Sequence, residues 1–239
     1  MGGILGEIPS SIFDIKTLES LDLYGIDMKK IPKEIAKLRN LKVLNITYHQ
    51  LSSLPDEICE LEKLEEIFIT DGAYDYLITL PQNIGNLKKL KKLKIGKVKA
   101  LPASIGDLEN LEILDCFLEP HSVPKEIANL HNLQYLCIRF DKACEFPIEC
   151  ICNMTKLETL DICGGTFKAL PACIKNLVNL WRINLEDTGV EKIPSEISHL
   201  KLLEELVVTG NKLTSTPEGI RELKKLVKMD LSYNNFELE

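Results

Sequence analysis

Hydrophobic positions along the chain recur in a unit that combines two different spacings. Each unit opens with apolar residues three positions apart, as in Pro32-x-x-Ile35-x-x-Leu38. This spacing is typical of a 3₁₀ or helical turn. A shorter segment of period two follows, as in Leu44-x-Ile46, and it predicts a strand whose apolar side chains point inward. The pattern therefore predicts short turns that alternate with short strands.

Prolines set the length of this unit. They recur at steps of 21 to 26 residues, most often 23, at Pro9, Pro32, Pro55, Pro81, Pro102, Pro124, Pro147, Pro171, Pro194 and Pro217. An isoleucine stands three residues after each of them except Pro147, where Ile151 comes one position late. Proline suits the first position of a turn because its missing N–H would be unpaired there anyway. The unit P-x-x-I-x-x-L-x-x-L-x-x-L-x-L thus runs through the whole chain, about ten times.

One such unit cannot bury its own apolar stripe, so successive units must stack. Stacked strands form a parallel sheet on the inner, concave face, and the bulkier turns splay the outer, convex face. We therefore expect a curved α/β solenoid of about ten repeats that extends over residues 1–239 as one domain.

The repeated unit resembles the leucine-rich-repeat family, in its 23-residue L-P-x-x-I variety, over essentially the whole chain. That variety is found in Ras-associated scaffold proteins, plant intracellular and immune-receptor proteins, and bacterial effectors. The resemblance implies a horseshoe-shaped module that binds a protein on its concave face. Small GTPases and signalling or immune proteins are the partner classes that it suggests, but fold-level similarity does not select among them.

One column departs from the family pattern. Family members usually place asparagine eight positions after the first strand leucine, where its amide bonds to the backbone of adjacent turns. Only Asn211 and Asn234 follow this rule here, whereas Ile26 and Val98 cannot form such bonds. We therefore expect an irregular spine through most of the repeats, in which backbone or water replaces the asparagines.

Composition narrows the function classes. The net charge of −7 disfavours general nucleic-acid binding, which requires neutralisation of phosphates. No apolar run approaches the roughly 18 residues that a membrane span needs. The eight cysteines lie mid-chain, and several fall in predicted strands, so we expect mostly reduced thiols, a cytoplasmic location and a monomer. Two Asn-x-Thr sequons, at Asn45 and Asn153, are the evidence for an oxidising compartment.

A partner surface is expected where aromatic and arginine side chains gather on the sheet. The predicted patch combines apolar residues with flanking charges and one residue at the rim: Ile113, Phe117, Tyr135, Asp115, Arg139 and Phe140. Phe68, Trp181 and Arg182 are predicted to extend the same face. Such residues are enriched at interface hot spots, although aromatics also stack along a sheet simply to stabilise it.

Two further features leave alternatives open. A lysine run, residues 88–99, is either a docking site for an acidic partner or one half of cross-strand ion pairs in the order Glu65–Lys91–Glu112, and we favour the ion pairs. An insertion at residues 71–76 either contacts a ligand at the rim or only lengthens a loop.

No catalytic constellation is evident. The histidines are scattered, and the cysteines at 144, 150 and 152 lack the spacing of a zinc site. We therefore expect no enzyme activity, no metal and no cofactor. Both ends lack a polar capping repeat, which favours a second hypothesis, the ligand-recognition portion of a larger immune receptor or pathogen effector. A purely structural role is a third.

Overall fold

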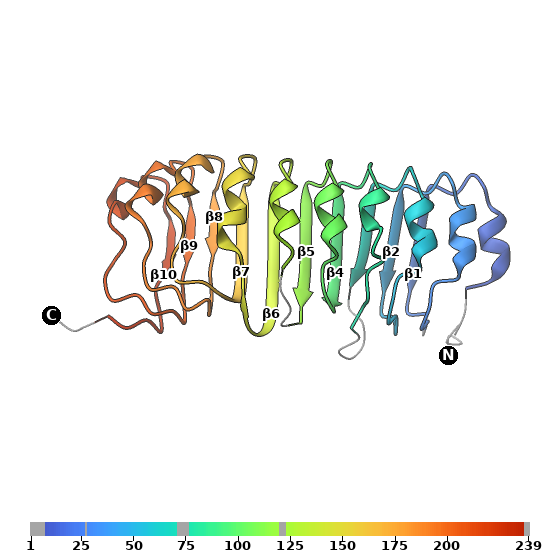
Figure 1. Cartoon of the computed structure of the whole chain (residues 1–239), viewed down its shortest axis with the longest axis horizontal. Helices are drawn as coiled ribbons and strands as arrows, with labels where there is room; N and C mark the ends of the chain where they lie inside the picture. Colours follow the sequence, from blue (N-terminus) through green and yellow to red (C-terminus); the bar gives the residue numbers. More distant parts are fainter. Residues whose placement is uncertain (1–7, 27, 71–76, 120–122, 237–239) are drawn as a thin grey trace. The chain divides into compact units, whose positions relative to one another are not determined.

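The computed structural model describes residues 8–26, 28–70, 77–119 and 123–236. The chain divides into two compact units, unit 1 from Met1 to Glu119 and unit 2 from Pro120 to Glu239. In both, each repeat supplies one short 3₁₀ turn followed by one strand (Figure 1). The alternation of turns and strands that the sequence predicts is therefore confirmed.

Unit 1 contains five turns and five strands, in the order η1 (Ser10–Asp14), β1 (Ser20–Tyr24), η2 (Lys33–Lys37), β2 (Val43–Thr47), η3 (Asp56–Glu60), β3 (Glu66–Thr70), η4 (Ile84–Asn86), β4 (Lys92–Val98), η5 (Ala103–Asp107) and β5 (Ile113–Leu118). Unit 2 continues the order with η6 (Lys125–Asn129), β6 (Tyr135–Glu145), η7 (Ile148–Asn153), β7 (Thr159–Thr166), η8 (Ala172–Asn176), β8 (Arg182–Asn184), η9 (Ser195–His199), β9 (Glu205–Val207), η10 (Ile220–Glu222) and β10 (Lys228–Asp230).

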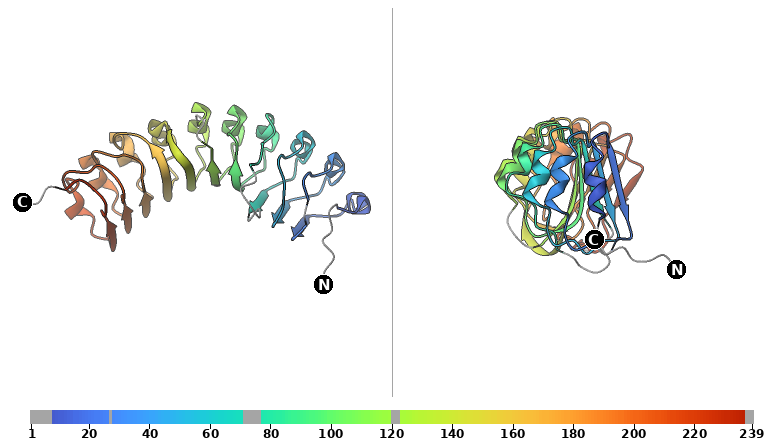
Figure 2. Two further views of the ribbon diagram at one scale, coloured as in Figure 1. Left: turned by 90° about the horizontal axis from the view of Figure 1, so that it is seen from below. Right: turned by 90° about the vertical axis from the view of Figure 1, so that its right-hand side faces the viewer.

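Within each unit the strands pair in sequence order and all pairs are parallel. The sheet lies on one side and the 3₁₀ turns lie on the opposite side (Figure 2). This is the solenoid arrangement that the repeat predicts. We call the sheet surface that faces away from the turns the open face.

The turns follow directly from the three-residue spacing of apolar positions. In the second repeat, Ile35 N–H donates to the Pro32 carbonyl at 3.1 Å, Leu38 N–H to the Ile35 carbonyl at 3.0 Å, and Leu41 N–H to the Leu38 carbonyl at 2.9 Å. Bonds that span three residues define a 3₁₀ turn and place every third side chain on one face. Proline precedes the first helical residue of each described turn except η4 and η10.

The core lies between the sheet and the turns. Ile35, Leu38, Leu41 and Leu44 are each 0% exposed, and Ile46 is 1% exposed. Full burial of one such side chain contributes roughly 1.5–3 kcal/mol, so each repeat depends on its neighbours for most of its stability.

The spine beside the core takes two forms. In the last repeats, Asn211 is 4% exposed and its Oδ1 accepts from Thr188 N–H at 3.1 Å and Val190 N–H at 2.9 Å. At the matching position of β4 stands Val98, whose carbonyl accepts from Glu119 N–H at 3.2 Å. Backbone pairing thus replaces the asparagine there, as the sequence predicts.

Two cysteines on neighbouring turns are joined. A disulfide links Cys152 of η7 to Cys173 of η8, with their Cα atoms 5.4 Å apart. The other six cysteines are thiols, and five of them are buried. Among the described residues, no helix is long and apolar enough to cross a membrane.

Candidate functional site

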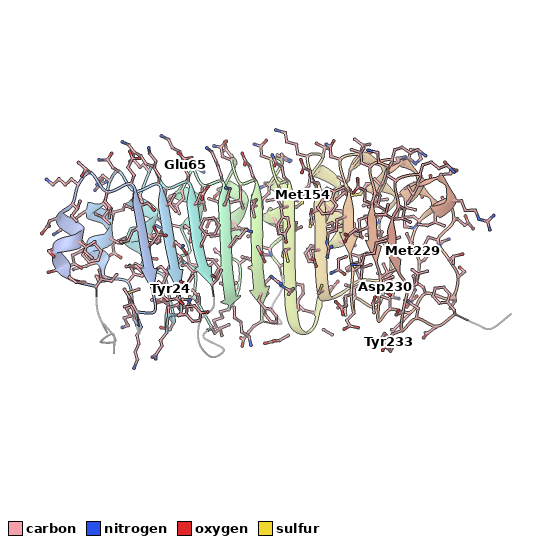
Figure 3. The ribbon with its side chains drawn as sticks, turned by 180° about the vertical axis from the view of Figure 1, so that it is seen from behind. Tyr24, Glu65, Met154, Met229, Asp230 and Tyr233 are labelled. Atoms are coloured by element: carbon pink, nitrogen blue, oxygen red, sulfur yellow. A yellow bond between two sulfur atoms is a disulfide. The ribbon has the colours of Figure 1, made fainter. Side chains whose placement is uncertain are left out.

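The open face is built by strand alternation. In β2 and β3 the first, third and fifth residues are half-exposed and the second and fourth are buried. Strands β1, β2 and β3 are parallel and pair without a register shift, so their equivalent outward side chains form columns. The register shifts after Ile95 of β4 and after Arg139 of β6. Figure 3 shows this surface, with Tyr24 near the C-terminal end of β1 and Glu65 at the opposite edge of the sheet.

In unit 1 the structure places three of the predicted residues on one strand. Ile113, Asp115 and Phe117 are alternate outward residues of β5, and all are half-buried. The Lys97 ammonium lies 5.7 Å from the centre of the Phe117 ring, which is a cation–π distance. Phe68 is also half-buried and outward, and it pairs in register with Lys94 of β4.

In unit 2 the structure places Tyr135 and Arg139 on the same face of β6. Tyr135 is half-buried and pairs with Thr159, whereas Arg139 is exposed and pairs with Cys163. The predicted middle patch is thus described as two halves, Ile113 with Phe117 in unit 1 and Tyr135 with Arg139 in unit 2.

The rim position predicted for Phe140 is wrong. Its side chain is only 7% exposed, because β6 extends to Glu145 and strand alternation turns residue 140 inward after Ile138. A Cβ added to Gly165 would lie 3.0 Å from Phe140 Cε2, so the ring packs against this glycine. Phe140 therefore belongs to the core.

Trp181 and Arg182 have different environments. Trp181 is 40% exposed and precedes β8. The Arg182 guanidinium forms an ion pair with the Glu205 carboxylate, which Lys228 also approaches at 3.9 Å. Arg182 is therefore engaged within unit 2, whereas the side chain of Trp181 remains partly exposed.

The charges of unit 1 bear out the cross-strand interpretation of the lysine run. Lys91 pairs with Glu65 and Lys92 with Glu66, both at 2.8 Å. The hydrogen bond and the charge of Lys91 lower the pKa of Glu65, and Glu65 raises the pKa of Lys91 in return. Ion pairs at the surface contribute little to stability, but these pairs partly neutralise the charge of the lysine run.

Burial suppresses the reactivity of three thiols, Cys59, Cys150 and Cys163. Burial raises the pKa of Cys59 and of Cys150 to about 12. Burial, followed by a hydrogen bond to Asp161, also raises the pKa of Cys163. Thiols of this kind are poor nucleophiles near neutral pH. Within the described ranges, no group of three or more His, Cys, Asp or Glu side chains could hold a metal ion.

The contact between Tyr24 and Tyr48 was not predicted from the sequence. Tyr24 is 75% exposed, and its ring meets that of Tyr48 edge-to-face, with centroids 5.1 Å apart and planes at 70°. Tyr24 falls in an outward column, but Tyr48 follows β2 in a left-handed conformation with φ of 55°, and no sequence pattern reports this contact. The rim loop at residues 71–76 lies outside the described residues.

The chain is similar in sequence to proteins that contain leucine-rich repeats. Residues 40–172 match the family model described as a leucine-rich repeat region. TMV resistance protein N of Nicotiana glutinosa is 32% identical over 63% of this chain and 14% of its own length. Disease resistance protein RML1A of Arabidopsis thaliana is 28% identical over 72% of this chain and 17% of its own. The chain thus spans about a sixth of the length of these relatives.

Among solved structures, the plant peptide hormone receptor RGFR1 in complex with RGF2 superposes with a TM-score of 0.84. It is 27% identical, and the match covers 96% of this chain and 38% of the receptor chain.

Proposed function

Because the chain belongs to the leucine-rich-repeat family, we propose that it is a non-catalytic recognition module that binds a protein partner on its open face. The observation that carries the proposal is a set of outward, partly or fully exposed apolar side chains on strands β1, β3 and β5 of unit 1, at Tyr24, Phe68, Ile113 and Phe117. Aromatic side chains on a rigid surface lose little entropy when they bind, which suits them to hot spots.

The comparisons support binding of a peptide or protein. The RGFR1 receptor was solved in complex with RGF2, and 96% of this chain superposes on part of that receptor. For this chain, the partner classes that we propose are a small GTPase or a signalling or immune protein. No nucleic acid is proposed as partner, in keeping with the net charge of −7.

A second candidate function is the ligand-recognition portion of a larger immune receptor or effector. Two disease-resistance proteins of plants are among its relatives, and the chain matches only 14% and 17% of their lengths. In this role the open face would still bind the ligand, while signalling would come from other parts of a longer protein.

The test is a binding screen with paired variants. The immobilised chain would select binders from a displayed peptide library, and each binder would be measured against two open-face variants, Phe68→Ala with Phe117→Ala in unit 1 and Tyr135→Ala with Arg139→Ala in unit 2. The matched control is Lys33→Ala with Lys37→Ala, two exposed residues of turn η2. Circular dichroism would verify each fold, and light scattering would check the monomer that we also propose.

We expect at least one open-face variant to weaken binding about 30-fold, the size of a 2 kcal/mol hot spot, and the turn variant to leave it unchanged. Binding that is lost in the turn variant and kept in both open-face variants would overturn the proposal. The unit whose variant has the larger effect would contain the centre of the interface.

We further propose a cytoplasmic location, supported by the six cysteines that remain thiols. In a reducing compartment Cys152 and Cys173 would also be reduced. Mass-tagging of thiols in acid-quenched cells, followed by denaturation, would then count eight tags per chain. A count of six would place the protein in an oxidising compartment instead.

A further inference from the structure

One column of side chains lies at the edge where the strands begin, directly before the first outward residue of each strand. In unit 1 its neighbours are joined by backbone hydrogen bonds of 2.7–2.8 Å, through Lys42 to Glu19, Glu65 to Lys42, Lys91 to Glu65, and Glu112 to Lys91. Acid and lysine alternate along it. Lys42 pairs with Glu19 at 2.8 Å, Lys91 pairs with Glu65 at 2.8 Å, and each lysine stands between two glutamates.

The same column in unit 2 has an indole in place of a lysine. The backbone N–H of Trp181 donates to the Glu158 carbonyl at 3.0 Å, and the backbone N–H of Glu204 donates to the Trp181 carbonyl at 2.8 Å. Both glutamates are exposed. In the described part of the chain, neither carboxylate makes a hydrogen bond or an ion pair. Unit 2 therefore repeats the two acids of the unit 1 pattern but lacks the cation between them.

These three residues line a hollow on the surface. Its remaining lining residues are Asn179, Leu202 and Lys225. Asn179 Nδ2 donates to the Thr155 carbonyl at 3.1 Å, which leaves its Oδ1 as an acceptor. The Lys225 ammonium lines the hollow but pairs with neither carboxylate among the described contacts. Leu202 is 39% exposed and adds apolar surface beside the ring.

We propose that this hollow binds an arginine side chain of a protein partner, stacked on Trp181 between Glu158 and Glu204. Glu158 and Glu204 stand one step of about 4.8 Å on either side of Trp181 along the column, so a guanidinium over the ring could meet a carboxylate on each side. A guanidinium suits the site better than an ammonium, because it is planar, stacks on aromatic faces and donates several N–H bonds in a fork. The inference rests on the proposed function, since the arginine would arrive on a protein partner.

The experiment uses Trp181 as its own reporter, because the chain contains a single tryptophan. The whole chain would be titrated with the peptide acetyl-Leu-Arg-Leu-amide while indole fluorescence and the indole ¹H–¹⁵N resonance are followed. A peptide in which citrulline replaces arginine is the matched probe, since it keeps the shape and removes the charge. We expect saturable shifts with the arginine peptide, binding weaker by about fivefold or more with citrulline, and a loss of affinity in added salt.

Matched variants test the acids. Glu158→Gln with Glu204→Gln should weaken binding of the arginine peptide on the order of tenfold. Glu191→Gln with Glu218→Gln, two exposed acids of the same unit, should leave it unchanged although the net charge is equally altered. Equal binding of the arginine and citrulline peptides, or equal losses in both variants, would overturn the inference.

The outcome is separable from that of the proposed function. The tripeptide reports on the hollow alone and carries no other part of a partner. A chain whose open face binds library peptides but whose indole ignores arginine would overturn only the arginine site. An indole that selects arginine in a chain whose open-face variants lose nothing would overturn only open-face recognition.

Discussion

The spine of unit 2 satisfies its backbone groups in two different ways. In the repeats of β8, β9 and β10 the strands are three residues long, and Asn211 and Asn234 bond to the backbone of the segments that follow β8 and β9. In the repeats of β6 and β7 the strands are eleven and eight residues long, and they pair again after a register shift, as at Cys144 with Gly165. In the repeats of β6 and β7, where Asp141 and Gly165 stand in the asparagine column, backbone pairing along the longer strands satisfies these groups instead.

The two arrangements differ in how many residues supply the hydrogen bonds of the spine. Asn211 alone bonds to Thr188, Val190, Leu185 and Thr209 through one buried amide, so much depends on a single residue. The long strands distribute the same task over many backbone bonds. Side chains are then free to vary, provided that they fit.

The largest expected effect comes from removal of the buried amide. Asn211→Ala would leave the backbone N–H groups of Thr188 and Val190 without an acceptor, and we expect it to lower the free energy of unfolding by about 3 kcal/mol. Urea denaturation would measure the loss. Asn235→Ala changes the same residue type at an exposed site and should cost less than about 0.5 kcal/mol. Similar losses at both sites would contradict the role of the amide.

The reverse exchange should also destabilise. Val98 is fully buried, and the backbone groups around it are already paired, through Ile78 N–H to Lys97 and Lys99 N–H to Ile78. An amide introduced by Val98→Asn would find no free partner, so we expect a loss of about 2 kcal/mol in the same assay. Val227→Asn, at a site 83% exposed, is the control. A stabilised Val98→Asn chain would show that the long strands leave groups unsatisfied.

A smaller effect is expected where a long strand depends on fit. In Gly165→Ala the added Cβ would lie 3.0 Å from both Ile162 Cγ2 and Phe140 Cε2. Such overpacking costs typically 1–3 kcal/mol, and we expect the lower half of that range because the ring can tilt. Gly96→Ala meets only the Ile69 carbonyl, at 3.7 Å, and should be nearly neutral to folding. A double variant with Phe140→Leu should recover part of the Gly165→Ala loss if the ring is the obstacle.

The smallest effect concerns the histidine that occupies the asparagine column in unit 1. His49 is 3% exposed, its Nδ1 accepts from Leu51 N–H at 3.0 Å, and burial lowers its pKa. The unfolded chain therefore takes up a proton near pH 6.5 that the folded chain resists, so stability falls as the pH drops below that value. The slope from this residue is at most about 1.4 kcal/mol per pH unit.

Denaturation at pH 7.5 and pH 5.5 measures this dependence. His49→Asn should flatten the acid side of the profile, whereas His199→Asn, at an exposed histidine, should not. Equal pH dependence in the wild type and in His49→Asn would show that this histidine titrates alike in the folded and unfolded chains.

Much of the fold could be predicted because the residues of each repeat determine its turn and its strand through local contacts. Each Pro-x-x-Ile-x-x-Leu segment closes its own 3₁₀ bonds. Val98 in the asparagine column predicted a spine completed by backbone or water, and the structure shows backbone bonds there. The length of β6 could not be foreseen, since it depends on pairing with β7 after a shift in register, and with it the burial of Phe140 was missed. The disulfide was not predicted either, because it depends on how η7 packs beside η8, which brings the Cα atoms of Cys152 and Cys173 to 5.4 Å, and the repeat pattern does not specify this approach.

The candidate surface was less predictable than the fold. Outward columns follow from register alone, and they placed Phe68, Ile113 and Phe117 correctly on the open face. How an outward side chain is held depends on contacts that no column reveals, such as the ion pair of Arg182 with Glu205 or the edge-to-face contact of Tyr24 with Tyr48.

The link between Cys152 and Cys173 has a mechanical consequence. The bond closes a loop of 21 residues between two neighbouring turns. If tension were applied along the chain, the repeats on either side would peel away one after another, but this loop would transmit force directly through sulfur. About 70 Å of contour length would stay hidden until a reductant released it. In a force-extension trace the oxidised protein should therefore be shorter by that step than the reduced protein.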